Sequence, residues 1–158
     1  MTAKRIIGRL LMAFVLVSIG VAIGKQTAAS KIAATAGAGA PPPGAPDRVV
    51  VYYLHGVPCI TCTLIETTTA ELVRQEFAQP VRAGKMEFVS LNYLDPANAA
   101  LAEKYRVGGN MVIAVRFANG REAGHVRLDK VMELASDADR LADYLREGIR
   151  SALSGGGP

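Results

Sequence analysis

The sequence predicts an α/β domain that follows an N-terminal hydrophobic segment. Three observations lead to this fold class. Short apolar runs typical of strands alternate with longer amphipathic stretches typical of helices from residue 49 onward. The dipeptide Asn119-Gly120 separates two strand-like runs and is a strong signal for a tight hairpin turn. A basic start followed by a long apolar run is typical of an export segment.

The alternating pattern gives the element order β-α-β-α-β-β-α. Pro80 should end the first helix, while Asp95 should cap the second and Pro96 should open it. Ser136 is the expected cap of the last helix. The expected strands cover residues 49–54, 86–91, 111–117 and 122–126, and the expected helices cover residues 60–79, 96–105 and 137–153, with Cys59 an alternative start for the first.

Two of these helices carry an apolar stripe at helical spacing, which should face the core of the domain. In the first helix the stripe consists of Leu64, Ile65, Leu72, Val73 and Phe77. In the last helix it consists of Leu141, Tyr144, Leu145 and Ile149. No internal repeat interrupts this single-domain pattern.

The charge pattern gives little support to nucleic-acid binding. The net charge is +4, and the basic residues are spread along the chain without a Lys/Arg cluster or interleaved aromatic residues. The hydrophobic fraction of 50% is raised by residues 1–46, while the remainder has an ordinary globular composition. The composition therefore divides the chain into one domain and an N-terminal appendage.

Residues 1–25 are expected to be a membrane anchor or a signal segment. Basic residues precede the uninterrupted apolar run 10–23, so the C-terminal domain should be exported while the basic residues stay in the cytoplasm. The run fits the hydrophobic region of a cleaved signal peptide. Counted from Ile6 it is also close to the length that spans a bilayer. Lys25 and Lys31 make a poor cleavage region, which favours the anchor.

The remaining boundaries follow from composition. Residues 26–46 are rich in Ala, Gly and Pro and should form a linker that holds the domain away from the membrane. The folded domain is expected over residues 47–154, and residues 155–158 should be a flexible tail.

The only two cysteines, Cys59 and Cys62, directly follow the first predicted strand. If Cys62 lies in the first turn of the helix, the i, i+3 spacing places both sulfurs on one face and allows a disulfide. The backbone N–H groups and dipole at a helix N-terminus favour a thiolate at Cys59, which is therefore the candidate nucleophile. A purely structural disulfide is the alternative, but so small a loop removes little chain entropy.

Two further side chains are candidates for the same site. His55 could lend positive charge to Cys59, join Cys59 and Cys62 as a third metal ligand, or simply be an exposed histidine at the end of the strand. A closed structural zinc site would need a fourth ligand, and His125 lies far away in the predicted hairpin. Glu66, four residues after Cys62, could accept the proton of the resolving thiol or be a solvated helix charge.

Residues 47–153 resemble the thioredoxin-like superfamily. The matching features are the strand that leads into Cys59-Ile60-Thr61-Cys62, the segment 105–108 ahead of a strand, the Asn119-Gly120 turn and the terminal helix. The resemblance implies a three-layer α/β/α fold whose central mixed sheet has a parallel first pair of strands and an antiparallel hairpin. It also implies dithiol–disulfide exchange, with Cys59 attacking and Cys62 resolving. A substrate strand would pair beside Gly109, Asn110 and Met111.

The chain departs from the thioredoxin pattern at three places. Pro58 stands before the first cysteine where thioredoxins carry Trp, and Tyr53 stands where they carry a buried acid. The stretch 108–112 lacks the proline that faces the disulfide in most relatives.

These features lead to a first hypothesis and two alternatives. The first is a membrane-anchored thiol–disulfide oxidoreductase on the periplasmic side of a bacterial inner membrane. It would act on thiols of exported proteins, need a redox partner and use no cofactor beyond the Cys59–Cys62 disulfide. The second is a metallochaperone-like protein that holds copper(I) through Cys59, Cys62 and His55. The third is a non-catalytic interaction module.

Overall fold

The computed structural model describes residues 47–155. The expectations for residues 1–46 and for 156–158 lie outside this part of the chain. Among the described residues, none of the helices has both the length and the hydropathy needed to cross a membrane. The elements in chain order are β1 (Arg48–His55), α2 (Ile60–Glu76), α3 (Ala78–Arg82), β2 (Met86–Asn92), η1 (Pro96–Asn98), α4 (Ala99–Lys104), β3 (Met111–Ala118), β4 (Arg121–Leu128), α5 (Val131–Leu134) and α6 (Ala138–Ser154).

The four strands form one mixed sheet in the order β2-β1-β3-β4. β1 pairs in parallel with β2, with Val51 opposite Phe88, and antiparallel with β3, with Val51 opposite Ala114. β3 and β4 form the expected antiparallel hairpin. At its turn Asn119 and Gly120 have φ angles of 53° and 73°, and this pair of positive values confirms the turn predicted from the dipeptide.

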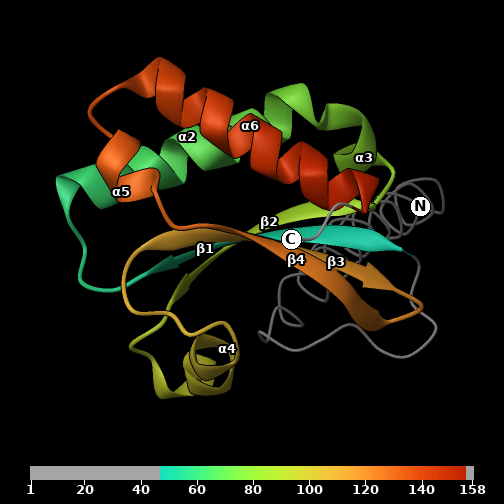
Figure 1. The fold of residues 1–158 in the computed structure, drawn as a ribbon, viewed down its shortest axis with the longest axis horizontal. Helices are drawn as coiled ribbons and strands as arrows, with labels where there is room; N and C mark the ends of the chain where they lie inside the picture. The colour runs from blue at the N-terminus through green and yellow to red at the C-terminus, as the bar shows by residue number, and fades with distance from the viewer. Residues whose placement is uncertain (1–46, 156–158) are drawn as a thin grey trace, which may run out of the picture. The chain divides into compact units, whose positions relative to one another are not determined.

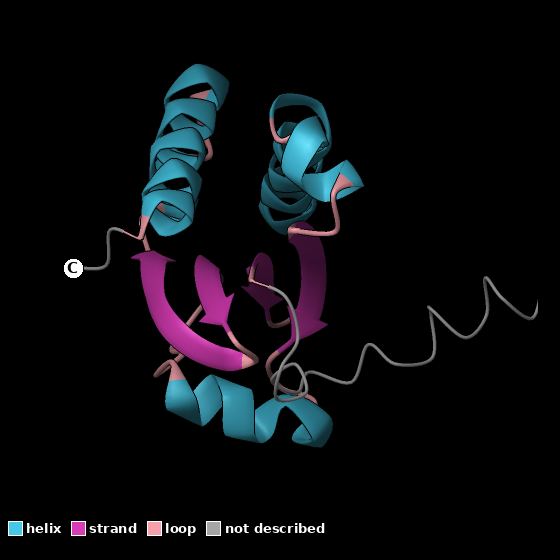
Figure 2. Cartoon of the chain, turned by 90° about the vertical axis from the view of Figure 1, so that its right-hand side faces the viewer, coloured by secondary structure: helices cyan, strands magenta, loops and turns pink. Residues whose placement is uncertain are grey.

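Helices cover both faces of the sheet, as Figures 1 and 2 show. The face under α2 and α6, called here the α6 face, also carries α3 and α5, whereas α4 covers the opposite α4 face. Side chains alternate along β1 between the two layers because successive residues of a strand point to opposite sides. Val49, Val51 and Tyr53 pack in the α6-face core. Their neighbours Val50, Tyr52 and Leu54 pack in the α4-face core, so the predicted three-layer arrangement is confirmed.

A polar cluster, called here the Glu122 network, bridges β4 and the end of α4 on the α4 face. The Tyr105 hydroxyl donates to Glu122 Oε2 at 2.9 Å, and His125 Nδ1 donates to Glu122 Oε1 at 2.9 Å. Lys104 completes the network with an ion pair to Glu122. Burial of the Glu122 carboxyl disfavours its charge, but the hydrogen bonds from Lys104, Tyr105 and His125 outweigh this and lower its pKa. Burial and the bond to Glu122 raise the pKa of Tyr105.

The first helix ends earlier than expected. α2 stops at Glu76, and a separate short helix, α3, contains Pro80 instead of ending before it. Pro80 is the third residue of α3, where a backbone N–H would have no partner within the helix, so the ring is tolerated. In the predicted stripe, Ile65, Leu72, Val73 and Phe77 are buried, but Leu64 is 43% exposed.

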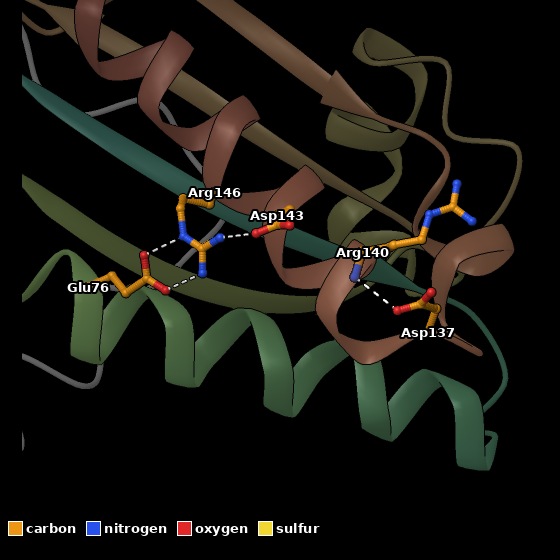
Figure 3. Close-up of polar contacts among 5 residues, drawn as sticks. All are labelled: Glu76, Asp137, Arg140, Asp143 and Arg146. Atoms are coloured by element: carbon orange, nitrogen blue, oxygen red, sulfur yellow. Dashed lines mark hydrogen bonds and ion pairs between the residues drawn. The ribbon is translucent and has the colours of Figure 1, made fainter.

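The ends of the later helices also differ from the expectation. Asp137, not Ser136, caps α6, because its Oδ1 accepts a hydrogen bond from Arg140 N at 3.1 Å (Figure 3). The segment after Asp95 begins as the 3-10 helix η1 before it becomes α4, and the Asp95 side chain caps it as expected. The one-turn helix α5 was not predicted, because four residues are too few to show a helical period.

Helices α2 and α6 are joined by an arginine clamp (Figure 3). Arg146 of α6 donates through Nε and Nη2 to the two carboxylate oxygens of Glu76 on α2, both at 2.6 Å. Its third contact is to Asp143, one turn earlier on α6. The hydrogen bond from Arg146 lowers the pKa of Glu76. Behind the clamp, Leu141, Leu145 and Ile149 of α6 are fully buried, and Tyr144 packs against them at the edge.

Candidate redox site

Cys59 and Cys62 lie where the sequence pattern placed them, at the junction of β1 and α2. β1 ends at His55, the chain crosses Gly56, Val57 and Pro58, and α2 begins at Ile60. Cys59 is the N-cap of α2 and has extended backbone angles, φ −148° and ψ 161°. The two sulfurs are joined as a disulfide, with their Cα atoms 5.0 Å apart.

The two sulfurs have different surroundings. Cys59 is exposed, whereas Cys62 is only 5% exposed. The backbone N–H of Cys62 donates to Cys59 Sγ at 3.0 Å, so the Cys59 sulfur takes the place that an Asp or Ser oxygen occupies at an ordinary helix cap. A thiolate at Cys59 would strengthen this bond and gain from the helix dipole. The outer sulfur is therefore the one suited to nucleophilic attack.

Cys62 is held from three sides. Asn110 Nδ2 donates to Cys62 Sγ at 3.0 Å, and the Tyr53 hydroxyl donates to the Cys62 carbonyl oxygen at 3.0 Å. The Val57 carbonyl oxygen lies 3.7 Å from the same sulfur, where it can accept the S–H of the reduced thiol. These contacts come from β1, from the loop before α2 and from the residue before β3, and they fix the inner sulfur in place.

Tyr53 replaces the buried acid of thioredoxins with a neutral donor. Its side chain is fully buried, and burial together with the charge of Glu66 raises its pKa to about 12. The phenol therefore stays protonated at physiological pH and cannot accept a proton from Cys62. Glu66 is half-buried on α2, one turn after Cys62, and its role as a proton acceptor remains a prediction.

His55 contacts Gly56 and Tyr53, whereas a metal site would require it to face the cysteine sulfurs. Its Nδ1 donates to the Gly56 carbonyl at 3.0 Å, and its ring stacks on Tyr53 with the ring centres 5.7 Å apart. Within residues 47–155, no group of three or more His, Cys, Asp and Glu side chains is arranged to hold a metal ion. The set His55, Cys59 and Cys62 is therefore not assembled in this disulfide state.

The segment predicted to bind substrate is divided by the structure. Asn110 reaches Cys62 directly, and Gly109 precedes it as a half-exposed residue. Met111 starts β3 opposite Leu54, but its side chain is buried in the α4-face core, away from α2. The substrate-binding role of Gly109, Asn110 and Met111 stays a prediction.

Two neighbours of the site, Met132 and Tyr93, could not be named from the sequence. Met132 on α5 has its Sδ 3.8 Å from Asn110 Nδ2. Tyr93, after β2, approaches Gly56 so closely that a Cβ there would meet the Tyr93 hydroxyl oxygen at 2.7 Å. Gly56 was the one local signal for such a close approach, because a residue with a side chain would not fit there. Nothing in the sequence pointed to Met132.

The sheet order β2-β1-β3-β4, with only the first pair parallel, places a Cys-x-x-Cys disulfide at the N-terminus of the helix that follows the central strand β1. The domain has a thioredoxin-like fold. It lacks the cis-proline of that fold, because residues 47–155 contain no cis peptide bond and Asn110 stands beside the disulfide.

The similarities between this chain and known proteins are confined to solved structures. No protein-family model matches the chain, and no curated protein matches it. Solved structures similar to the thioredoxin-like domain include thioredoxin from Trypanosoma brucei brucei, with 21% identity over 68% of this chain and 80% of that one and a TM-score of 0.40. Thioredoxin from Thermus thermophilus has 19% identity over 70% and 77%, with a TM-score of 0.39. Oxidized mitochondrial thioredoxin 3 from Saccharomyces cerevisiae has 17% identity over 59% and 78%, with a TM-score of 0.36.

The geometry of the thioredoxin-like domain suits reversible thiol–disulfide exchange. An incoming thiolate can reach Cys59 but not the buried Cys62, so a mixed disulfide would form at the outer sulfur. Cys62 lies within bonding distance of Cys59 without a change of backbone, so it can displace the partner again. A disulfide used only for stability would not require one sulfur to be exposed.

Proposed function

We propose that this protein is a thiol–disulfide oxidoreductase that is tethered to a bacterial inner membrane and acts on thiols of exported proteins. The observation that carries the proposal is the asymmetry of the disulfide. Cys59 is exposed at the N-cap of α2 and accepts the Cys62 N–H, whereas Cys62 is buried beneath it. This arrangement exposes one sulfur to attack and leaves the buried sulfur to resolve the mixed disulfide.

The exchange proceeds in two displacements. A substrate thiolate attacks Cys59 Sγ, the Cys59–Cys62 bond breaks, and the electron pair goes to Cys62 Sγ, which then takes up a proton. A second substrate thiolate attacks the substrate sulfur of the mixed disulfide and releases Cys59 as a thiolate. The substrate gains a disulfide and loses two electrons to the cysteine pair. Run in reverse, the same steps reduce a substrate disulfide, and a redox partner must restore the pair in either direction.

A protein substrate is supported by apolar side chains beside the exposed sulfur. Val57 is 75% exposed and Ile60 is 93% exposed, and they lie on either side of Pro58 and Cys59. Such exposure of large apolar side chains next to a reactive group favours contact with the apolar residues around a substrate cysteine. A small thiol such as glutathione would gain little from them.

The tether and the exported location are supported by the pattern of residues 1–46. Basic residues precede the apolar run 10–23, and an Ala-, Gly- and Pro-rich stretch follows it. Cell fractionation of the full-length protein tests this part. We expect the chain to stay with the inner membrane after alkaline washing, and added protease to degrade it once the outer membrane is opened. A full-length chain in the cytosolic fraction would contradict the tether, and a shortened soluble form in the periplasm would indicate cleavage.

A redox titration tests the enzymatic proposal. Full-length protein is equilibrated across glutathione and dithiothreitol ratios, and free thiols are counted by alkylation and mass. We expect one reversible two-electron step with a midpoint between about −120 and −270 mV, the range of working oxidoreductases. The Cys59→Ser and Cys62→Ser variants should lose the step. A midpoint below about −300 mV would show a structural disulfide and refute the proposal.

A further inference from the structure

Asn110 stands out because its amide joins three parts of the redox site. Its Oδ1 accepts the Gly56 N–H at 3.0 Å, and its Nδ2 donates to Cys62 Sγ at 3.0 Å and lies 3.8 Å from Met132 Sδ. A backbone N–H can only donate, so the contact with Gly56 fixes which end of the amide carries the oxygen. The NH₂ group must therefore face the sulfur.

The inner sulfur has few other sources of positive potential. Cys62 is 5% exposed, and burial disfavours a charged thiolate. The helix N-terminus and the Cys62 N–H favour charge on Cys59, not on Cys62. Across residues 47–155, no Lys or Arg side chain forms a hydrogen bond or ion pair with Cys62, and Tyr53 donates to its carbonyl oxygen, not to its sulfur. The Asn110 amide is thus the donor that reaches this sulfur from outside α2.

We propose that Asn110 is a catalytic residue that stabilises Cys62 as a thiolate during disulfide exchange. The inference rests on the proposed oxidoreductase function. When a substrate thiolate attacks Cys59, the bond to Cys62 breaks and the negative charge develops on Cys62 Sγ, 3.0 Å from the Asn110 donor. The hydrogen bond then becomes charge-assisted and strengthens at the moment the thiolate leaves. In the reverse direction, the same bond favours the attacking form of Cys62.

The position of Asn110 makes this role independent of the substrate. It immediately precedes β3, whose first residue pairs with Leu54 of β1, so its backbone is anchored to the central sheet. The Gly56 contact holds the side chain against the loop that carries Cys59. The donor is therefore preorganised and needs no rearrangement when charge develops.

The test compares two Asn110 variants with a matched control in full-length protein. Asn110→Leu removes the donor without adding charge. Asn110→Asp removes the donor but keeps an oxygen for the Gly56 N–H. Asn119→Asp makes the same chemical change at the distant hairpin turn, where Asp tolerates the positive φ of 53°. Circular dichroism establishes that each variant is folded.

The first measurement is the rate at which dithiothreitol reduces the Cys59–Cys62 disulfide. We expect dithiothreitol to reduce the disulfide about tenfold more slowly in both Asn110 variants than in wild type, because a hydrogen bond to a charged group is lost. Asn119→Asp should match wild type. A wild-type reduction rate in Asn110→Leu overturns the inference. If the leucine variant does not fold, a wild-type reduction rate in Asn110→Asp overturns it instead.

The second measurement separates this inference from the proposed function. In a Cys59→Ala background, the ultraviolet absorbance of the thiolate reports the ionisation of Cys62 once the tyrosinate signal of a variant that lacks both cysteines is subtracted. We expect ionisation to require a higher pH when Asn110→Leu is added, and unchanged ionisation overturns the inference. This reading does not depend on whether the protein turns over any substrate. Failure of the wild-type redox titration would refute the oxidoreductase instead.

Discussion

The two faces of the sheet share the same four strands but are stabilised in different ways. On the α6 face, α2 and α6 cover the strands with a layer that includes the fully buried Leu141, Leu145 and Ile149. On the α4 face, the short helix α4 covers fewer side chains, and the Glu122 network closes the side toward β4. The disulfide belongs to the first layer. Dispersion and burial therefore support the redox site, whereas the Glu122 network, whose carboxyl has a lowered pKa, lies on the other side of the sheet.

The largest expected effect separates the two cores directly. Leu145→Ala should lower the free energy of unfolding by about 2 to 5 kcal/mol, because a fully buried leucine leaves a cavity that its neighbours fill only in part. Leu101→Ala, the matched change on α4, should cost about 2 kcal/mol or less, because Leu101 is only half-buried. Urea unfolding followed by circular dichroism measures both. Equal losses would show that the two faces contribute equally.

A smaller effect tests how tightly α6 lies on the sheet. A Cβ at Gly148 would meet Leu128 Cδ2 on β4 at 2.3 Å, and Leu128 is buried. Gly148→Ala should therefore destabilise the domain by about 1 to 3 kcal/mol through overpacking, although Ala favours a helix. Gly108→Ala is the control, because nothing lies within 4 Å of its added Cβ. A more stable Gly148→Ala variant would mean that α6 can shift.

The Glu122 network should contribute less. Tyr105→Phe removes the hydroxyl that donates to Glu122 Oε2 and should cost about 1 kcal/mol, since Lys104 and His125 still contact the carboxylate. The same unfolding measurement applies. The redox midpoint should not move, because the network lies on the α4 face; a shift in that midpoint would show coupling between the two faces.

The smallest effect is a pH dependence that arises from Glu122. Its pKa is lowered in the folded protein, so its contribution to stability is present at neutral pH, above the ordinary pKa of a glutamate. It is lost as the pH falls through the lowered folded value, when the unfolded chain has already taken up its proton. Glu122→Gln should flatten the decline of the unfolding midpoint below about pH 5. A decline of the same slope in the variant would assign the dependence to other carboxyl groups.

The sequence predicted the elements whose signals are local. The strand into Cys59, the Asn119-Gly120 hairpin and the Asp95 cap depend on patterns of a few neighbouring residues, and the structure has all three. Errors arose where local signals compete. Ser136 and Asp137 are both good caps, and the structure uses Asp137. Pro80 looked like a helix stop but lies in the first turn of α3.

The candidate site was predictable in its chemistry but not in its contacts. The spacing of Cys59 and Cys62 and their position at the start of a helix predicted which of them is the nucleophile. The bond from Asn110 to Cys62 joins residues 48 positions apart and depends on how β3 pairs with β1. The contact between Tyr53 and the Cys62 carbonyl likewise depends on how α2 packs over β1. Such contacts arise from the arrangement of elements and have no local sequence signal.

The hairpin also affects how neighbouring molecules can meet. Within the described sheet β4 is an edge strand, and the edge of a sheet can recruit strands from other chains. Its ladder with β3 is interrupted between Arg116 and Phe117, opposite Gly124, whose φ is 156°. The strand begins at Arg121, and Arg127 stands just before its last residue, Leu128. The bulge and the arginine charges make β4 a poor strand for a second chain to pair with. Copies of this domain at high local concentration are therefore protected from pairing with one another through β4.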